Sequence, residues 1–309
     1  MQYNNLKLKR RQAVFRWFYI RSLMFCFVIS VILALFTAIR LFAVGFSVKE
    51  DDEKRNECTV KTDFPMFTGE TLVYTFKWEP PWYMFFLPKM EAGELTFKFL
   101  GIEEYRGKPV VKIVIEARSS GALAKLADIK VEDEFIFYSD PETLCAEGSV
   151  SKIREGKRKR QLEVEYFQDE RRLIFRAYDE SVTPPQLQKD VTKSDLPQCV
   201  RDPFSTLYFY RTLPLVKGYE KIIAVGNDDK VLEVHTRIEK QESVPTPAGK
   251  VVAWKIRTDA LRDGLFSQEG DFRIWMATDE HRAPVRFEAN VRLGNVLGVL
   301  KKRSQKPGC

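Results

Sequence analysis

The stretch VVKIVIEA at residues 110–117 decides the fold class of this 309-residue chain, because it is rich in the β-branched residues that favour strands. Comparable stretches that alternate, to some degree, between the two faces of a strand lie at residues 71–78, 94–99, 133–138, 161–167, 172–176, 231–238, 251–257, 272–276 and 285–289. Few helical periods separate them. The pattern predicts a mainly β protein with a large antiparallel, strongly curved sheet, a barrel-like domain or a sandwich, and not a βαβ fold.

One helical signal interrupts the strands. Asp202 has the residue type of an N-cap, and Pro203 suits the first helical position. An apolar stripe follows at Phe204, Leu207, Tyr208 and Leu213. We expect one short helix here that packs on the sheet. The preceding residues 181–201 contain three prolines and are expected to form a long surface loop.

The N-terminal region contains a long apolar segment. Residues 22–39 read SLMFCFVISVILALFTAI without a charge, and the apolar run continues past Arg40, which is enough to cross a bilayer core of about 30 Å. Six basic residues precede it, and no acidic residue occurs before Phe46, so the N-terminus is expected in the cytosol. An uncleaved transmembrane helix is therefore predicted. A cleaved signal peptide, with small residues at 43–45, is the alternative.

These signals divide the chain into five parts. The predicted parts are a basic cytosolic lead-in at 1–21, an anchor or signal segment at 22–46, a linker at 47–63, a single exported β-rich domain at 64–304 and a tail at 305–309. The domain would lie in the periplasm of a bacterium. It would be tethered to the inner membrane by the anchor, or released after signal cleavage.

The excess positive charge belongs to the N-terminal region. Seven basic residues up to Arg40 equal the net charge of +7, so the exported domain is formally neutral and nucleic-acid binding is excluded. One local basic cluster remains within the domain, at Lys152, Arg154, Lys157, Arg158, Lys159 and Arg160. It is either a solvated hairpin tip or, through residues 157–160, a contact for anionic lipid headgroups or an acidic envelope polymer.

Five cysteines set the redox expectations. Cys26 lies in the apolar segment, which leaves Cys58, Cys145, Cys199 and Cys309 on the oxidising side, where three pairings are open. The wide spacing contains no Cys-x-x-Cys motif. Structural disulfides or buried thiols are therefore expected, with neither a redox motif nor a zinc site.

Residues for catalysis are scarce. His235 and His281 are both expected to be solvated, and no metal site or cofactor is predicted from them. Asp133 is the one weak catalytic candidate, because strand alternation places it on the same face as Phe135 and Phe137, toward the interior. A carboxyl group buried there would have a raised pKa suited to acid/base work, although an acid at the start of a strand is usually at the wet rim.

The connection between the first two predicted strands is unusual for its length and composition. It carries six consecutive large apolar residues between prolines: Trp82, Tyr83, Met84, Phe85, Phe86 and Leu87. Hairpin connections are normally short and polar. The segment, here called the aromatic loop, could fold back to cap one end of the sheet, dip into the membrane, or form the lid of an apolar ligand cavity.

Five short motifs in order resemble a known family. They are GETLVY at 69–74 with AGEL at 92–95, DPFSTLY at 202–208, TPAG at 246–249, IWMATDE at 274–280 and RAPV at 282–285. In this order they resemble the bacterial envelope family catalogued as domain of unknown function 3108, over about residues 64–300. The resemblance implies an exported, mainly antiparallel β domain, often behind a signal sequence or anchor. It supplies no catalytic residues.

Two classes of function follow. The first is a non-enzymatic cell-envelope protein that binds an apolar or lipid-like ligand, or an envelope partner, through the aromatic loop. The second is a hydrolase that acts on an envelope glycan or lipid through carboxylates such as Asp133. The first is preferred, because the sequence offers no nucleophile motif and no phosphate-binding glycine loop.

Overall fold

The chain forms one antiparallel sheet of fourteen strands, as seen in a computed structural model that describes residues 67–121, 130–259, 272–291 and 294–305. The strands are β1 (Glu70–Glu79), β2 (Met90–Tyr105), β3 (Lys108–Ser119), β4 (Glu132–Ser139), β5 (Ala146–Glu155), β6 (Arg158–Phe167), β7 (Arg172–Asp179), β8 (Gln186–Lys193), β9 (Glu220–Asn227), β10 (Lys230–Thr246), β11 (Gly249–Thr258), β12 (Phe272–Ala277), β13 (Pro284–Val291) and β14 (Gly294–Gln305). Their spatial order runs from β8 back to β1, then from β14 back to β9. The sheet is thus two meanders joined where β1 pairs with β14.

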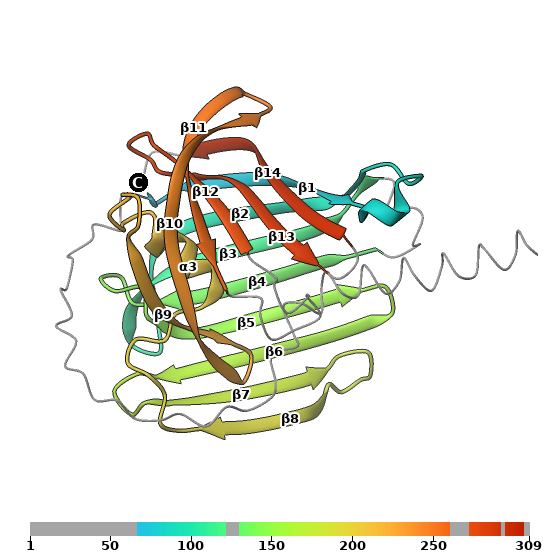
Figure 1. The fold of residues 1–309 in the computed structure, drawn as a ribbon. Helices are drawn as coiled ribbons and strands as arrows, with labels where there is room; N and C mark the ends of the chain where they lie inside the picture. The colour runs from blue at the N-terminus through green and yellow to red at the C-terminus, as the bar shows by residue number, and fades with distance from the viewer. Residues whose placement is uncertain (1–66, 122–129, 260–271, 292–293, 306–309) are drawn as a thin grey trace, which may run out of the picture.

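The sheet curves until its two ends meet, which makes the domain barrel-like. In Figure 1 the β9–β10 hairpin crosses over the face of β4–β7. Lys189 of β8 pairs with Asp229, in the turn between β9 and β10, at 2.9 Å. Ala224 of β9 and Val231 of β10 pack against a buried cluster that β5, β6 and β7 contribute to. The prediction of a strongly curved antiparallel sheet is confirmed.

The predicted short helix lies inside the curve. It is α3 (Pro203–Tyr210), and Asp202 caps it by accepting hydrogen bonds from Phe204 N and Ser205 N, both at 2.8 Å. Leu207 and Tyr208 are buried in the main core, whose other members come from both halves of the sheet. The helix therefore fills the space that a sheet of this curvature would otherwise leave open.

All ten predicted strands are present, and four more were missed: β5, β8, β9 and β14. The prediction of a loop over residues 181–201 was wrong in its middle, where β8 pairs with β7. β8 is an edge strand with the sequence QLQKDVTK, and most of it is exposed. It lacks apolar alternation because its pairing relies on backbone hydrogen bonds. β14 continues to Gln305, the first residue of the predicted tail.

The predicted anchor and linker, at 22–46 and 47–63, lie outside the described residues, and so do Cys26, Cys58 and Cys309. Within the part of the chain that is described, no helix combines the length and apolar character that crossing a membrane requires. The anchor stays a prediction from the sequence.

Candidate functional site

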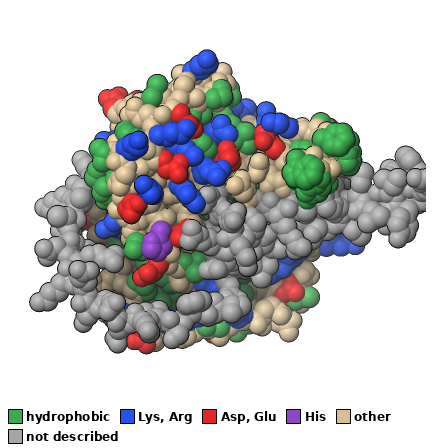
Figure 2. Space-filling view, viewed as in Figure 1, with side chains coloured by type: hydrophobic (Ala, Val, Ile, Leu, Met, Phe, Trp, Pro, Cys, Tyr) green, Lys and Arg blue, Asp and Glu red, His purple; other side chains and the backbone are tan. Residues whose placement is uncertain are grey.

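The aromatic loop projects from one end of the sheet, between β1 and β2. Trp82 is 87% exposed, Phe85 85% and Phe86 68%. Figure 2 shows the resulting hydrophobic patch at the end of the molecule where Figure 1 places this loop. Of the three alternatives for the loop, the one in which it folds back to cap the sheet disagrees with this exposure. Prolines lie on both sides of the segment. Its large side chains lie beyond the end of β1 and before the start of β2.

The conformation of the aromatic loop is fixed by local contacts. Trp82–Met84 form the 3-10 helix η2, in which Met84 N donates to Pro81 O at 2.8 Å. Lys89 Nζ and Glu79 Oε1, 2.6 Å apart, close the base of the loop. Gly294 packs against the same base, where an added Cβ would lie 2.1 Å from Glu79 O. The aromatic side chains are therefore presented on a preorganised turn.

The basic cluster lies at the same end of the sheet as the aromatic loop. Every second connection of an antiparallel meander falls at one end, so the β1–β2 and β5–β6 connections share it, as Figure 1 shows. Lys157, Arg158 and Lys159 are exposed at the β5–β6 tip, which confirms the hairpin. Their charges lie on the side of the molecule that carries the aromatic patch.

Arg160 is a correction to the predicted headgroup contact. Its register partner is Ile153, which is buried, and Arg160 is on the same inward face of β6 as Leu162 and Val164. Its Nε and Nη2 atoms are buried without a hydrogen-bond partner among the described residues. Burial lowers the pKa of the guanidinium. Arg160 is therefore not available to a surface ligand at the tip.

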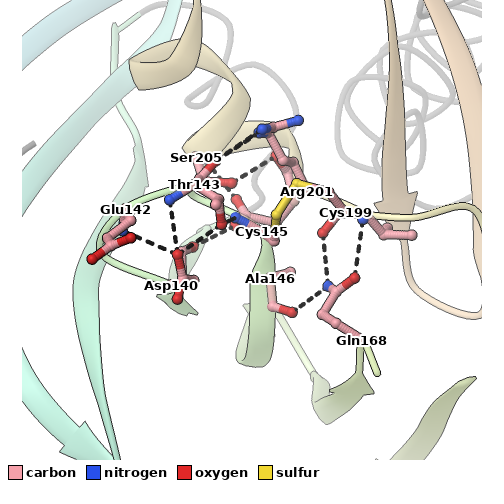
Figure 3. Close-up of a disulfide and its surroundings, with 12 residues drawn as sticks. Asp140, Glu142, Thr143, Cys145, Ala146, Gln168, Cys199, Arg201 and Ser205 are labelled. Atoms are coloured by element: carbon pink, nitrogen blue, oxygen red, sulfur yellow. Dashed lines mark hydrogen bonds between the residues drawn. A yellow bond between two sulfur atoms is a disulfide. The ribbon is translucent and has the colours of Figure 1, made fainter. Parts of the chain in front are cut away.

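Cys145 and Cys199 form a disulfide at a Cα–Cα distance of 4.9 Å, one of the pairings that the sequence left open. It holds the segment before α3 between β5 and β9. In this segment Val200 O accepts from Ala146 N at 2.8 Å, and Arg201 N donates to Ala224 O at 2.9 Å. Figure 3 shows the disulfide and the Gln168 amide beside it. The disulfide therefore helps to fix the position of Asp202, which follows Arg201 in the chain.

Asp133 lies where the sequence placed it, on the inward face of β4, and it is only 4% exposed. It lines a cleft between β4–β6, the start of α3 and the β9–β10 turn. Burial raises the pKa of Asp133 to about 7, although a hydrogen bond from Arg154 N at 2.7 Å acts in the opposite direction. The expectation that an acid at a strand's start is wet was wrong here, because β9 and β10 cover this face.

Two further carboxylates line this acidic cleft, and the sequence did not identify them as site residues. Asp228 reaches it from the β9–β10 turn, and its pKa is raised to about 7 by burial and by the charge of Asp229. Asp202 reaches it from the start of α3, and burial raises its pKa as well. No signal near Asp228 in the sequence reveals this role, since the cleft forms only when β9–β10 crosses the sheet.

The cleft is small. It measures about 560 Å³ when the space at its open mouth is counted, but only about 30 Å³ is open to the centres of water molecules. Since one water needs about 10 to 15 Å³ of such space, the inner part holds about two. Neither this cleft nor a smaller cavity beside Tyr74 has a lining residue from the aromatic loop. The loop is therefore not the lid of either.

The two histidines lie away from the cleft. His235 is exposed on β10, on the face of the strand opposite to the buried Val234 and Thr236. This confirms the prediction that His235 is solvated. His281 is partly exposed in the β12–β13 connection. Within the described residues, no three His, Cys, Asp or Glu side chains are grouped so that they could hold a metal ion.

Comparisons with known proteins agree with the fold. A model of the family described as "Protein of unknown function (DUF3108)" matches residues 73–301, as the motifs indicated. A search of curated proteins found no match. A crystal structure of a beta-barrel-like protein of domain of unknown function DUF1849 from Brucella abortus is similar, with 9% identity, a TM-score of 0.50, and coverage of 77% of this chain and 97% of that one. A "putative lipoprotein" from Parabacteroides distasonis matches with 12% identity, a TM-score of 0.30, and coverage of 81% and 100%.

Proposed function

This chain belongs to the family described as Protein of unknown function (DUF3108), a description that assigns no activity, and we propose its function from its own surface. It is a non-enzymatic protein of the bacterial cell envelope that contacts a lipid bilayer through the end of its sheet that carries the aromatic loop. The basic residues Lys157, Arg158 and Lys159 assist at anionic headgroups.

The exposure of the aromatic loop is the observation that supports this proposal most. Fully burying one large apolar side chain stabilises a protein by about 1.5 to 3 kcal/mol. Trp82, Phe85 and Phe86 are largely exposed and lack most of this stabilisation in water. Trp and Tyr side chains favour the headgroup region of a bilayer, where a ring can be buried while its polar atom stays wet. The fixed turn means that little conformational entropy is lost on contact.

The reach of the N-terminal region is compatible with this contact. Between the predicted apolar segment and Phe67 lie the twenty residues 47–66, which can span at most about 66 to 72 Å. The ten residues of β1 extend about 34 Å from its start to the loop. A domain tethered at residue 46 can therefore turn its aromatic loop toward the same membrane.

The disulfide supports an oxidising compartment. Bonds such as Cys145–Cys199 persist in the periplasm and are rare in the cytosol. With the basic lead-in, this favours an inner-membrane protein whose C-terminal domain is periplasmic. Secretion after signal cleavage is the alternative, and the aromatic loop would then be the main membrane contact.

The hydrolase alternative has less support. Asp133 has a pKa suited to acid/base work, but the inner cleft beside it has room for about two waters and not for a sugar ring.

Hydrogen exchange of the full chain in lipid nanodiscs and in a neutral detergent tests the proposal. Amides at 82–87 and at the β5–β6 tip should exchange more slowly in nanodiscs with anionic lipid. The triple variant Trp82→Ser, Phe85→Ser, Phe86→Ser should lose the protection at both places. The control Leu187→Ser, Val252→Ser removes exposed apolar residues elsewhere and should keep it. Equal exchange of the wild-type loop in nanodiscs of every lipid composition and in detergent would reject the bilayer contact.

A further inference from the structure

The connection between β7 and β8 is another exposed tip at the end of the sheet that carries the aromatic loop. Connections of a meander alternate between its two ends, so the β1–β2, β5–β6 and β7–β8 connections share one end, as Figure 1 shows. Residues 181–185 read SVTPP and are all exposed. Val182 is 45% exposed. The membrane contact proposed above does not use this tip.

The β7–β8 tip is bonded to the basic β5–β6 tip beside it. Glu180 N donates to Lys159 O at 2.9 Å, which joins the two connections through their backbones. The Arg154 guanidinium spans both connections, because it donates to Arg160 O at 3.1 Å and pairs with Glu180 Oε2 at 2.5 Å. The two connections therefore form one unit, here called the double tip, which consists of residues 154–160 and 179–185.

The acidic side chains of the double tip are engaged within it. Glu180 is paired with Arg154, and Glu155 lies 3.8 Å from Arg158. The carboxylate of Asp179 accepts hydrogen bonds from the backbone and the hydroxyl of a serine in its own turn. None of these acids therefore projects alone from the unit, where it would repel a negatively charged surface.

The basic side chains of the double tip outnumber the acidic ones, five to three. Lys157 and Lys159 are exposed, and neither takes part in an ion pair among the described residues. Lysines at a membrane surface are attracted to anionic lipid over about one Debye length. The positive charge that the unit leaves unpaired is therefore complementary to anionic headgroups.

The β7–β8 half of the double tip is suited to enter the headgroup layer. Val182, Pro184 and Pro185 have no polar side-chain group, and the two prolines also have no backbone N–H. An N–H group that loses water without gaining a partner opposes the burial of a loop. Two such groups are missing here, so this apolar tip loses fewer hydrogen bonds to water than most turns would.

The double tip lies well apart from the aromatic loop. Six strand spacings separate the β1–β2 connection from the β7–β8 connection, which is about 28 to 29 Å measured along the curved sheet. One contact lets a body tilt on a surface, whereas two separated contacts restrict the tilt. Contact at both places would give the domain a defined orientation on the membrane.

We propose that the double tip is a second membrane contact, specific for a bilayer surface that contains anionic phospholipid, with Lys157 and Lys159 at the lipid phosphates and Val182 among the headgroups. This inference rests on the proposed function, in which the aromatic loop makes the first contact. It adds the β7–β8 tip to the surface that touches lipid.

Photo-crosslinking of the full chain in lipid nanodiscs tests the second contact. The substitutions Phe85→p-benzoylphenylalanine, Val182→p-benzoylphenylalanine and Val252→p-benzoylphenylalanine are made one at a time, and lipid adducts are measured by mass spectrometry. Position 85 reports the aromatic loop, and position 182 reports the double tip. Val252 is the matched control, since it is 50% exposed on the β10–β11 hairpin, whose tip lies at the other end of the sheet.

Adducts at positions 85 and 182 should exceed those at position 252 by at least about fivefold in nanodiscs that contain phosphatidylglycerol. In pure phosphatidylcholine, adducts at position 182 should fall by at least about threefold, because the attraction of the lysines is lost. The double variant Lys157→Gln, Lys159→Gln should cause the same fall in phosphatidylglycerol. The control Lys217→Gln, Lys250→Gln removes two exposed lysines elsewhere and should cause none.

The three positions separate a failure of the second contact from a failure of the proposed function. Adducts at position 85 with no excess at position 182 over position 252 would overturn the second contact and leave the aromatic-loop contact standing. Equal adducts at position 182 with and without anionic lipid would overturn the role of the lysines. No excess at position 85 over position 252 would reject the proposed function and, with it, the arrangement of two contacts.

Discussion

The aromatic loop and the acidic cleft depart from the usual distribution of side chains in opposite ways. The loop leaves Trp82 87% exposed, whereas the cleft buries Asp133 to 4%. Exposed apolar patches and buried polar groups are the informative exceptions to the rule that apolar residues lie inside. Each one is fixed by the surrounding fold, the loop by its closed base and the cleft by the crossing of β9–β10. The comparison separates two kinds of exception, an apolar surface that the fold leaves in solvent and a carboxyl group that the fold buries without a cationic partner.

A third region contains a buried acid that is paired with cations of the same chain. Glu70 is 1% exposed and pairs with Arg211 Nη1 at 2.5 Å, and Arg303 Nε lies 2.9 Å from its other oxygen. Burial acts to raise the pKa of Glu70, but the hydrogen bonds and charges of Arg211 and Arg303 hold it below its usual value. Asp133 has no such cation, and its pKa moves the other way.

Removing the charge of Glu70, the buried acid that is paired with Arg211 and Arg303, should have the largest effect on stability. Glu70→Gln leaves the buried Arg211 without its counter-charge, and we expect a loss of about 3 to 5 kcal/mol in the free energy of unfolding. Urea unfolding followed by circular dichroism measures it. Glu94→Gln, which breaks an exposed pair with Lys301, is the control and should change stability far less. Equal effects of the two variants would contradict the distinction.

The disulfide should contribute the next largest amount. It closes a loop of 54 residues and fixes the segment that carries Asp202. Replacing Cys145 and Cys199 by Ser should lower the free energy of unfolding by about 2 to 4 kcal/mol. Thermal unfolding of the variant and of the oxidised wild type measures the difference. An unchanged melting temperature would show that the backbone hydrogen bonds of Val200 and Arg201 hold the segment without the bond.

Asp133, which has no cationic partner, should make the free energy of unfolding depend on pH. The pKa of Asp133 is about 7 in the folded protein and near 3.8 when unfolded, so the folded state binds more protons between these values. Stability therefore falls as pH rises through this window, by about 2 to 3 kcal/mol between pH 5 and pH 8. Asp133→Asn should remove this contribution and leave that of Asp228, whose pKa is also raised to about 7, as measured by urea unfolding of variant and wild type at the two pH values. A variant that keeps the full pH dependence would show that Asp133 is ionised in the fold.

The sequence predicts the sheet well where strands are partly buried. The stretches at 110–117 and 133–138 became β3 and β4, because one face of each packs on the core and leaves an alternating pattern. β8 gave no such pattern, since it is an edge strand held by backbone hydrogen bonds. Strand alternation therefore reports burial, and it does not report pairing.

The candidate sites divide in the same way. Strand alternation placed Asp133 inward, and it also places Arg160 on the inward face with Leu162, a consequence that the basic cluster obscured. The same alternation along β6 places Tyr166 on the inward face, with Leu162 and Val164. Asp228 could not be found from the sequence, because its place in the cleft depends on two hairpins distant in sequence that cross in space.

The aromatic loop should contribute the least to stability. Replacing Trp82, Phe85 and Phe86 by Ser removes exposed side chains, so the free energy of unfolding in detergent should stay within about 0.5 kcal/mol of wild type. Urea unfolding measures it. A large loss would mean that the loop packs on the domain, and would remove the contrast with the buried acids.

Quenching of Trp82 fluorescence by spin-labelled lipids tests the membrane contact most directly. The full chain is placed in vesicles whose lipids carry a nitroxide near the headgroup, and the signal of Trp82 is the difference between wild type and Trp82→Phe. Trp82 should be quenched strongly, and the quenching should be greater with anionic lipid. Emission from Trp82 that remains typical of water and is not quenched would contradict the account.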